Sequence, residues 1–195
     1  MRQSKIHRQT SETDITIQLF LDGSGQAEVA TGIGFLDHML TLLARHGGLD
    51  LSVSVRGDLN VDDHHTVEDV GIVLGQALKD ALGEKRGISR FGHAVIPMDE
   101  ALASSAVDIS GRPWLSFNAR FSAEKVGGFS TQMTGEFFRA LAVNAGLTLH
   151  LSCVTGQNDH HIIEALFKSF ARSLAQACAI NSQAPNQIPS TKGLL

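Results

Sequence analysis

The sequence predicts an α+β fold in which two sheets flank a layer of helices, formed by tandem duplication of a strand-strand-strand-helix-strand-helix unit. A His-His-x-x-Glu segment occurs twice, beginning at His64 and again 96 residues later at His160. Before each copy, segments with strand and helix periodicity follow one another in the same order. A length of 195 residues with 43% hydrophobic side chains suits a single domain, residues 1–195, with a substantial core.

The first unit, expected over residues 1–86, opens with strands. Apolar and polar side chains alternate through residues 3–31, which predicts three short strands. Residues 22–25, Asp-Gly-Ser-Gly, have the composition of a hairpin turn into the strand at 27–30. We therefore expect the second and third strands to form a hairpin.

The same unit continues with a helix over 35–46, a strand over 49–56 and a second helix over 64–82. The acidic pair Asp62-Asp63 is expected to cap the second helix at its start. Its apolar stripe consists of Val67, Val70, Leu74, Leu78 and Ala81.

The second unit is expected over about residues 87–180 and repeats this order. The expected strands cover 88–97, 101–109, 114–121 and 147–154, and the expected helices cover 130–145 and 160–179. A tail, residues 181–195, follows the second unit. Tails of this kind commonly fray, but its Ser-Thr-Lys-Gly segment also offers hydroxyls, an ammonium group and open backbone to a phosphate.

Composition excludes some classes of partner. The formal net charge is -4 and the cationic residues are scattered, which argues against nucleic acid as a partner. No run approaches the roughly 18 apolar residues of a membrane span, and the basic amino terminus lacks the apolar segment of a signal peptide. We expect a cytoplasmic protein that acts on a small molecule and not on a membrane.

The two His-His-x-x-Glu segments predict metal binding. When such a segment opens a helix, the first His and the Glu lie on one face, while the second His points roughly 100° around the axis. Imidazole and carboxylate ligands without thiolate suit a divalent cation such as Zn, Mn, Fe or Ni. Each segment could therefore contribute to two ions.

Aligning the two units assigns the ligands to two ions. His38 of the first unit corresponds to Glu136 of the second, and the second His of each pair is expected to cross over to the other ion. The first ion would be held by His64, Glu68, His161 and Glu136. The second ion would be held by His38, His65, His160 and Glu164. Two positions of each octahedral ion would remain open for substrate or water.

Other interpretations of these residues stay open. The His pairs could be helix caps that face carboxylates, although a duplicated cap gives no reason for Glu at the same offset. Glu136 could be an ordinary surface residue of a helix. From the residues alone, Arg90 and Arg112 are most simply surface residues.

Five motifs resemble imidazoleglycerol-phosphate dehydratases of histidine biosynthesis, and they occur in the order found in that family. They are Phe35-Leu36-Asp37-His38-Met39-Leu40, Asp63-His64-His65-Thr66-Val67-Glu68-Asp69, Ser110-Gly111-Arg112-Pro113, Asn158-Asp159-His160-His161 and Pro189-Ser190-Thr191-Lys192-Gly193. The resemblance covers nearly the whole chain. In part of the family a His stands where this chain has Glu136.

The resemblance implies a hydro-lyase with two Mn²⁺ ions per active site. It implies conversion of D-erythro-imidazole glycerol phosphate to imidazole acetol phosphate. It also implies a homo-oligomer of 24 subunits with active sites at subunit interfaces. Glu12 corresponds to a Glu that contacts substrate, and we expect it to act in acid–base catalysis. Phosphate contacts are expected from Arg90, Arg112, Ser190, Thr191 and Lys192.

The chemistry of this substrate requires activation of the imidazole ring, because the proton to be removed lies on a carbon with no adjacent carbonyl. Two metal ions on the ring nitrogens would hold the ring as imidazolate. The ring electrons would then expel the hydroxyl and give a diazafulvene-like intermediate, from which loss of a proton leads to the ketone. Two other functions remain possible from the sequence: a dinuclear metallohydrolase, and a protein in which the clusters only join subunits or store metal.

Overall fold

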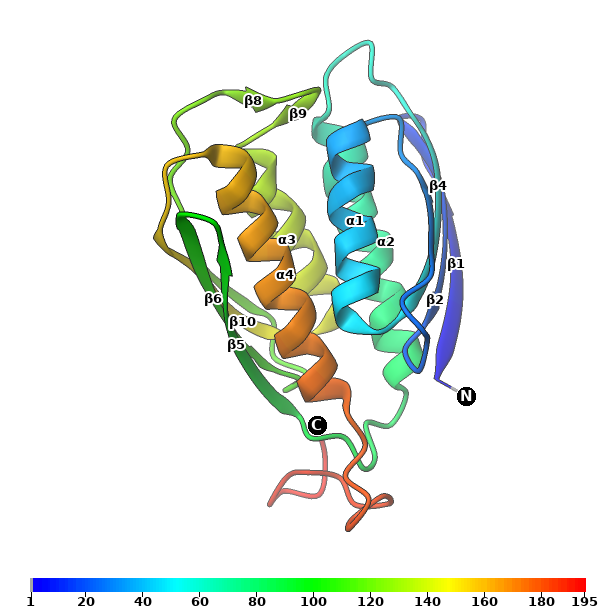
Figure 1. Ribbon diagram of the computed structural model, residues 1–195. Coiled ribbons are helices and arrows are strands. Elements are labelled where there is room, and N and C mark those ends of the chain that lie inside the picture. Colours follow the sequence, from blue (N-terminus) through cyan, green and yellow to red (C-terminus); the bar gives the residue numbers. More distant parts are fainter. Residues whose placement is uncertain (1) are drawn as a thin grey trace.

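The structure, a computed structural model that describes residues 2–195, places two four-stranded sheets on either side of a layer of helices (Figure 1). The strands of the first sheet are β1 (Gln3–Gln9), β2 (Thr13–Phe20), β3 (Ala27–Ala30) and β4 (Asp50–Gly57). The helices of the first half are α1 (Gly34–Gly47) and α2 (His64–Leu82). The predicted fold class is confirmed.

The second half supplies the other sheet and two more helices. Its strands are β5 (Phe91–Met98), β6 (Ala101–Asp108), β7 (Trp114–Asn118) and β10 (Thr148–Thr155), and its helices are α3 (Met133–Ala145) and α4 (Asp159–Cys178). A small hairpin of β8 (Lys125–Val126) and β9 (Phe129–Ser130) lies between β7 and α3 and has no counterpart in the first half of the described chain.

The two sheets have the same topology. Their strand orders are β1-β2-β4-β3 and β5-β6-β10-β7. In each sheet the last strand of the half pairs antiparallel with the second strand and parallel with the third. This correspondence, element by element, is what a duplicated unit predicts.

The predicted hairpin between the second and third strands is wrong. β2 pairs with β1 and β4, and β3 pairs only with β4, at the edge of the sheet. Residues 22–25 do turn the chain, but β4 lies between β2 and β3 in the sheet. A turn signal is local, whereas strand pairing is decided by which apolar faces are buried together.

The core lies between the helices and the inner faces of the sheets. Alternation in β2 buries Ile15, Ile17 and Leu19, and the predicted apolar stripe of α2 is buried. The contact between α2 and α3 is close because Gly71 and Gly75 leave room for the α3 backbone: a Cβ at either position would lie 2.7 Å from a carbonyl oxygen of α3.

All four helices of the described chain begin at the same end of the molecule, beside the β8–β9 hairpin, and end near the tail (Figure 1). The tail, residues 181–195, contains no helix or strand but contacts the second half of the chain. The amide of Gly87 donates to Gln187 at 2.8 Å, and Arg90 donates to the carbonyl of Pro189 at 2.9 Å. Within residues 2–195, no helix is long and apolar enough to cross a membrane.

Candidate active site

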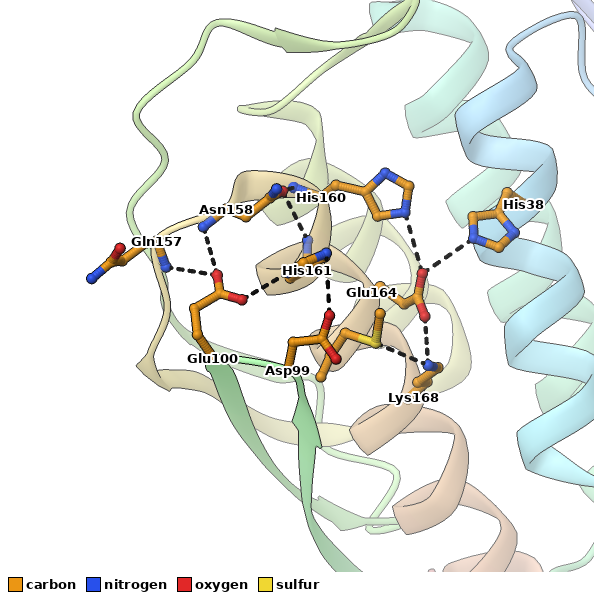
Figure 2. Close-up of polar contacts among 10 residues, drawn as sticks. His38, Asp99, Glu100, Gln157, Asn158, His160, His161, Glu164 and Lys168 are labelled. Carbon is orange, nitrogen blue, oxygen red and sulfur yellow. Dashed lines mark hydrogen bonds and ion pairs between the residues drawn. The ribbon is translucent and has the colours of Figure 1, made fainter.

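One histidine and carboxylate cluster is assembled within the chain, between α1 and α4 (Figure 2). The Nε2 atoms of His38 and His160 lie 3.2 and 3.3 Å from Oε2 of Glu164. One ligand atom from each residue lies within 4.8 Å of the others. Two imidazoles and one carboxylate oxygen form a donor set that suits a borderline or hard divalent cation. These are three of the four residues predicted for the second ion.

Lys168 holds the other oxygen of Glu164. Its Nζ atom donates to Oε1 at 2.5 Å, one turn further along α4. Burial alone would raise the pKa of Glu164, but hydrogen bonds from Lys168 and His38 outweigh that effect and lower it. Glu164 is therefore ionised and presents one free oxygen to the two imidazoles.

The start of α4 is fixed by two side chains. The Oδ1 atom of Asn158 accepts hydrogen bonds from the amides of His160 and His161, as an N-cap does. Glu100, in the turn between β5 and β6, accepts from the amides of Gln157 and Asn158. Figure 2 shows that Glu100 also faces the His161 ring.

The pairing of Glu100 with His161 determines which ring nitrogen carries the proton. The Nδ1 atom of His161 lies 2.7 Å from Glu100, and this contact, together with the Asn158 amide, lowers the pKa of Glu100 to about 2. An ionised carboxylate can only accept a hydrogen bond, so Nδ1 is the donor. The Nε2 atom then lies free of that bond, 3.8 Å from Asp99, and His161 is not part of the cluster of His38, His160 and Glu164.

The other cluster, between α2 and α3, is joined by an arginine. His64 Nε2 lies 3.6 Å from Glu68, and Glu68 accepts a hydrogen bond from Arg139 at 2.7 Å. Arg139 also binds Glu136, with Nε 2.7 Å from the carboxylate. Three of the four residues predicted for the first ion therefore lie side by side, with a guanidinium group satisfying both carboxylates. An ion held by Glu68 and Glu136 requires Arg139 to move.

His65 faces a different pair of carboxylates. Its Nδ1 atom lies 3.0 Å from Asp58, and its Nε2 atom lies 3.8 Å from Glu12. The hydrogen bond with Asp58 and the charge of Glu12 raise the pKa of His65. Glu12, in the turn between β1 and β2, is thus at the same end of the molecule as the clusters. Within the described chain, His65 does not reach the cluster of His38, His160 and Glu164.

The segment that contains the β8–β9 hairpin is anchored to both duplicated helices. Asp63, just before α2, accepts hydrogen bonds from the amide and hydroxyl of Ser130 at 2.6 and 2.7 Å. Asp159, the first residue of α4, accepts from the amides of Ser122 and Ala123. Both aspartates are buried. The prediction that both Asp62 and Asp63 cap α2 is therefore only half right: Asp62 accepts from the His64 amide, whereas Asp63 makes no capping bond.

Phe129 of the hairpin connects this segment to the cluster of His38, His160 and Glu164. It is fully buried, and its ring centroid lies 5.6 Å from that of Phe35. Phe35 in turn lies edge-on to His160 at 5.0 Å and to His38 at 6.4 Å. This aromatic stack of Phe129, Phe35 and the two imidazoles therefore supports the positions of His38 and His160.

A basic cavity of about 720 Å³ lies at the other end of the molecule, where α2 ends and the tail contacts the second half of the chain. The residues predicted to bind phosphate all line it, together with two lysines that the sequence analysis did not select. Its polar lining comprises Lys79, Lys85, Arg90, Ser110, Arg112, Ser190, Thr191 and Lys192. Arg90 and Arg112 share Asp108, at 2.7 and 3.7 Å, so the wall carries an excess of positive charge.

Sequence reasoning missed five residues that lie beside the predicted ones: Asp58, Lys79, Lys85, Arg139 and Lys168. Two of them had a signal. Lys168 follows Glu164 by four residues and Arg139 follows Glu136 by three, spacings that pair side chains on a helix. The other three depend on the tertiary fold, which brings loops or a helix end to the site.

Fold and site together define a class: an α+β enzyme with duplicated histidine and carboxylate clusters and a separate cavity lined by cationic side chains. Residues 31–174 match the family described as imidazoleglycerol-phosphate dehydratase. The chain belongs to the imidazoleglycerol-phosphate dehydratase family, whose members are hydro-lyases.

Relatives cover the full length of the chain. It is 56% identical to the imidazoleglycerol-phosphate dehydratase of Gluconobacter oxydans, over 100% of this chain and 98% of that protein. It is 57% identical to the enzyme of Desulforamulus reducens, with the same coverage. Among solved structures, imidazoleglycerol-phosphate dehydratase of Staphylococcus aureus superposes with a TM-score of 0.83 at 46% identity, covering 91% of this chain and 99% of that chain. The Pyrococcus furiosus enzyme in complex with (S)-C348 superposes with a TM-score of 0.83 at 36% identity, covering 97% of this chain and 100% of that chain.

Proposed function

We propose that this chain dehydrates imidazole glycerol phosphate to imidazole acetol phosphate in histidine biosynthesis. The observation that carries the proposal is the cluster of His38, His160 and Glu164, whose three ligand atoms lie within 4.8 Å of one another. Family membership supports the choice of substrate, and the basic cavity supports a phosphate group on it.

The donor set of the clusters fits Mn²⁺. Imidazole nitrogens with carboxylate oxygens and no thiolate suit this ion, and Lys168 leaves Glu164 one oxygen for it. Two bound ions would supply the positive charge that favours loss of a proton from the imidazole ring of the substrate. We infer that His38, His160 and Glu164 hold one ion, and that His64, Glu68 and Glu136 hold the other when Arg139 moves away.

The finer steps assign roles to the chain's own residues. Expulsion of the hydroxyl from the activated ring would give a diazafulvene-like intermediate, and a base must then take the proton from the neighbouring carbon. Glu12 fits the acid–base role because its carboxylate lies 3.8 Å from His65, beside the metal end of α2. The phosphate group is assigned to Arg90, Arg112, Ser190, Thr191 and Lys192 in the basic cavity.

The two parts of this site lie too far apart to serve one substrate molecule within one chain. Lys79 lines the cavity and His64 begins the same helix, so the two ends of α2 are separated by about 22 Å at 1.5 Å per residue. A substrate that is an imidazole with a three-carbon phosphate ester is much shorter. We infer that the metal end of one copy meets the cavity of another, in a homo-oligomer such as the 24-subunit assembly.

His65 and His161 support an oligomer for a separate reason, which requires the starts of the helices of two copies to meet. Each has its Nδ1 atom bound by a carboxylate, which leaves Nε2 available, yet neither joins the cluster of His38, His160 and Glu164 in its own chain. The crossover ligands would then come from a neighbouring copy.

The test is an assay of the purified protein loaded with manganese and given imidazole glycerol phosphate, with the ketone product followed by its ultraviolet absorbance. Loss of an outer partner of a metal ligand costs 10- to 100-fold, so removal of a ligand in His38→Ala should cost more than about 100-fold in activity and in manganese affinity. The matched control is His150→Ala, which removes an exposed histidine of β10.

Three results would contradict the proposal. Absence of ketone with any divalent cation would exclude the dehydratase activity, and release of phosphate in its place would indicate a hydrolase. Unchanged activity of His38→Ala would remove the cluster from the reaction. Particle size after chelation, measured by light scattering, tests the interfacial metals separately: a full-size particle without metal would argue against them.

A further inference from the structure

Lys85 is a buried lysine in the wall of the basic cavity. The residue is 9% exposed, and within residues 2–195 no carboxylate oxygen lies within 4.0 Å of its ammonium group. The nearby carboxylate of Asp108 is engaged by Arg90 and Arg112. Buried lysines are normally paired, because removing the charge from water is costly. Among the cationic residues of the cavity, Lys85 is therefore the buried one, and even the terminal carboxylate of Leu195, which borders the same turn, does not form an ion pair with it.

The backbone at Lys85 is also unfavourable for a residue with a side chain. Its φ is 59°, in the left-handed region where Cβ approaches the backbone. The ammonium group lies against the turn at Gly111, where a Cβ would be 3.4 Å from Nζ. Burial, and next the charge of Lys79, lower the pKa of Lys85. Strain and unpaired charge at one residue oppose folding, and such costs are concentrated at functional sites.

We propose that Lys85, the most buried of the cations that line the cavity, binds the phosphate monoester of the substrate. The proposal rests on the proposed function, because it deepens the phosphate end of that site. A phosphate dianion would supply the negative partner that Lys85 lacks, while Arg90, Arg112 and Lys192 contact the same group from the more exposed wall. The observation that points to Lys85 is that it is buried and has no carboxylate in contact with its ammonium group. Lys79 and Lys192, by contrast, are exposed.

The test uses Lys85→Met in the full-length, manganese-loaded protein, with inorganic phosphate as the probe. Methionine keeps the length of the side chain and removes the charge. We expect phosphate to raise the melting temperature of the unsubstituted protein and to raise that of the variant much less. The KM for imidazole glycerol phosphate should rise about 10- to 100-fold, as expected for a hydrogen bond to a charged group, with a smaller change in kcat. The matched control is Lys125→Met, at an exposed lysine of β8 outside the cavity.

Stability without phosphate separates a binding role from a structural one. Removal of an uncompensated buried charge should leave the melting temperature of Lys85→Met equal to or above that of the unsubstituted protein. A fall of several degrees would show that Lys85 holds the fold together and would overturn the inference.

Arg112→Ala distinguishes failure of the inference from failure of the proposed function. Arg112 is largely exposed, with 70% of its side chain accessible, so its removal should not disturb folding. If phosphate still stabilises Lys85→Met fully but no longer stabilises Arg112→Ala, the cavity binds phosphate without Lys85, and the inference is wrong. If phosphate stabilises both variants as it does the unsubstituted protein, the cavity is not the phosphate site, and this part of the proposed function fails as well.

Discussion

Alanine at Gly75 tests whether the close contact between α2 and α3 is required. An added Cβ would lie 2.7 Å from the carbonyl oxygen of Leu141 and 2.8 Å from Cβ of Asn144. Ordinary contacts begin at 3.4 Å, so the helices would have to separate locally by about 0.7 Å. One of these atoms is a main-chain oxygen inside a packed layer, which no side-chain rotation can move.

The expected cost follows from two opposing effects. Overpacking a core typically costs 1–3 kcal/mol, and a clash with backbone belongs at the upper end, about 3 kcal/mol. Alanine gains about 1 kcal/mol over glycine in a helix interior. Gly75→Ala should therefore lower the free energy of unfolding by about 2 kcal/mol, which corresponds to about 4–8 °C in melting temperature for a chain of this length.

The control is Gly135→Ala on α3, where the nearest atom to an added Cβ is a ring carbon of Phe117 at 3.5 Å. That variant gains the helix propensity without a clash and should be more stable by up to about 1 kcal/mol. Both are measured by denaturant unfolding of the metal-free protein at one protein concentration, because bound metal and assembly would add to apparent stability. Equal or greater stability of Gly75→Ala would refute the argument from close packing.

Two further predictions concern the turn at Asp50 and the aromatic stack. Asp50→Asn should destabilise the protein at pH 7, because hydrogen bonds from the amides of Gln26 and Ser24 lower the pKa of Asp50. A carboxylate with a lowered pKa stabilises the folded state above the unfolded pKa of about 3.8, and this stabilisation is lost as the pH falls through the folded pKa. The difference in unfolding midpoint should thus shrink between pH 6 and pH 3, and a constant difference would contradict this. Phe129→Ala should lower the free energy of unfolding by about 3–5 kcal/mol. It should also weaken manganese binding, since Phe129 supports Phe35 beside the cluster of His38, His160 and Glu164. An unchanged manganese affinity of the variant, measured by titration, would contradict the supporting role.

The sequence was sufficient to predict the four helices, the strands of the two sheets and much of the clustering at the start of the helices. Each His-His-x-x-Glu segment opens a helix, and the symmetry argument correctly brought His38, on α1, to Glu164, on α4, although 126 residues separate them. Two copies of one unit supply that information, because a position in one copy identifies its counterpart in the other. The ligand roles themselves remain predictions.

Contacts that break the symmetry could not be predicted. Within the described chain, the β8–β9 hairpin occurs in one half only. Nothing in the sequence marks Asp63 and Asp159 as the residues that anchor its segment, because these contacts depend on the tertiary structure. Arg139 satisfies Glu68 and Glu136 through the contact of α2 with α3, a tertiary feature. The wrong hairpin after β2 has the same origin: residues 22–25 specify a turn, and the position of β4 specifies the pairing.

The placement of the histidine and carboxylate clusters and of the basic cavity at opposite ends of the helices has a consequence for assembly. On the proposed function, each copy offers one half of a site at each end, so the contacts that join a cluster of one copy to the cavity of another are head to tail. Such contacts are all satisfied only when the arrangement closes. An assembly that has not closed would then have, at its edges, clusters without a cavity and cavities without a cluster. Turnover per chain would increase with particle size and reach its full value only in the closed shell. Activity per chain would therefore measure how complete the assembly is.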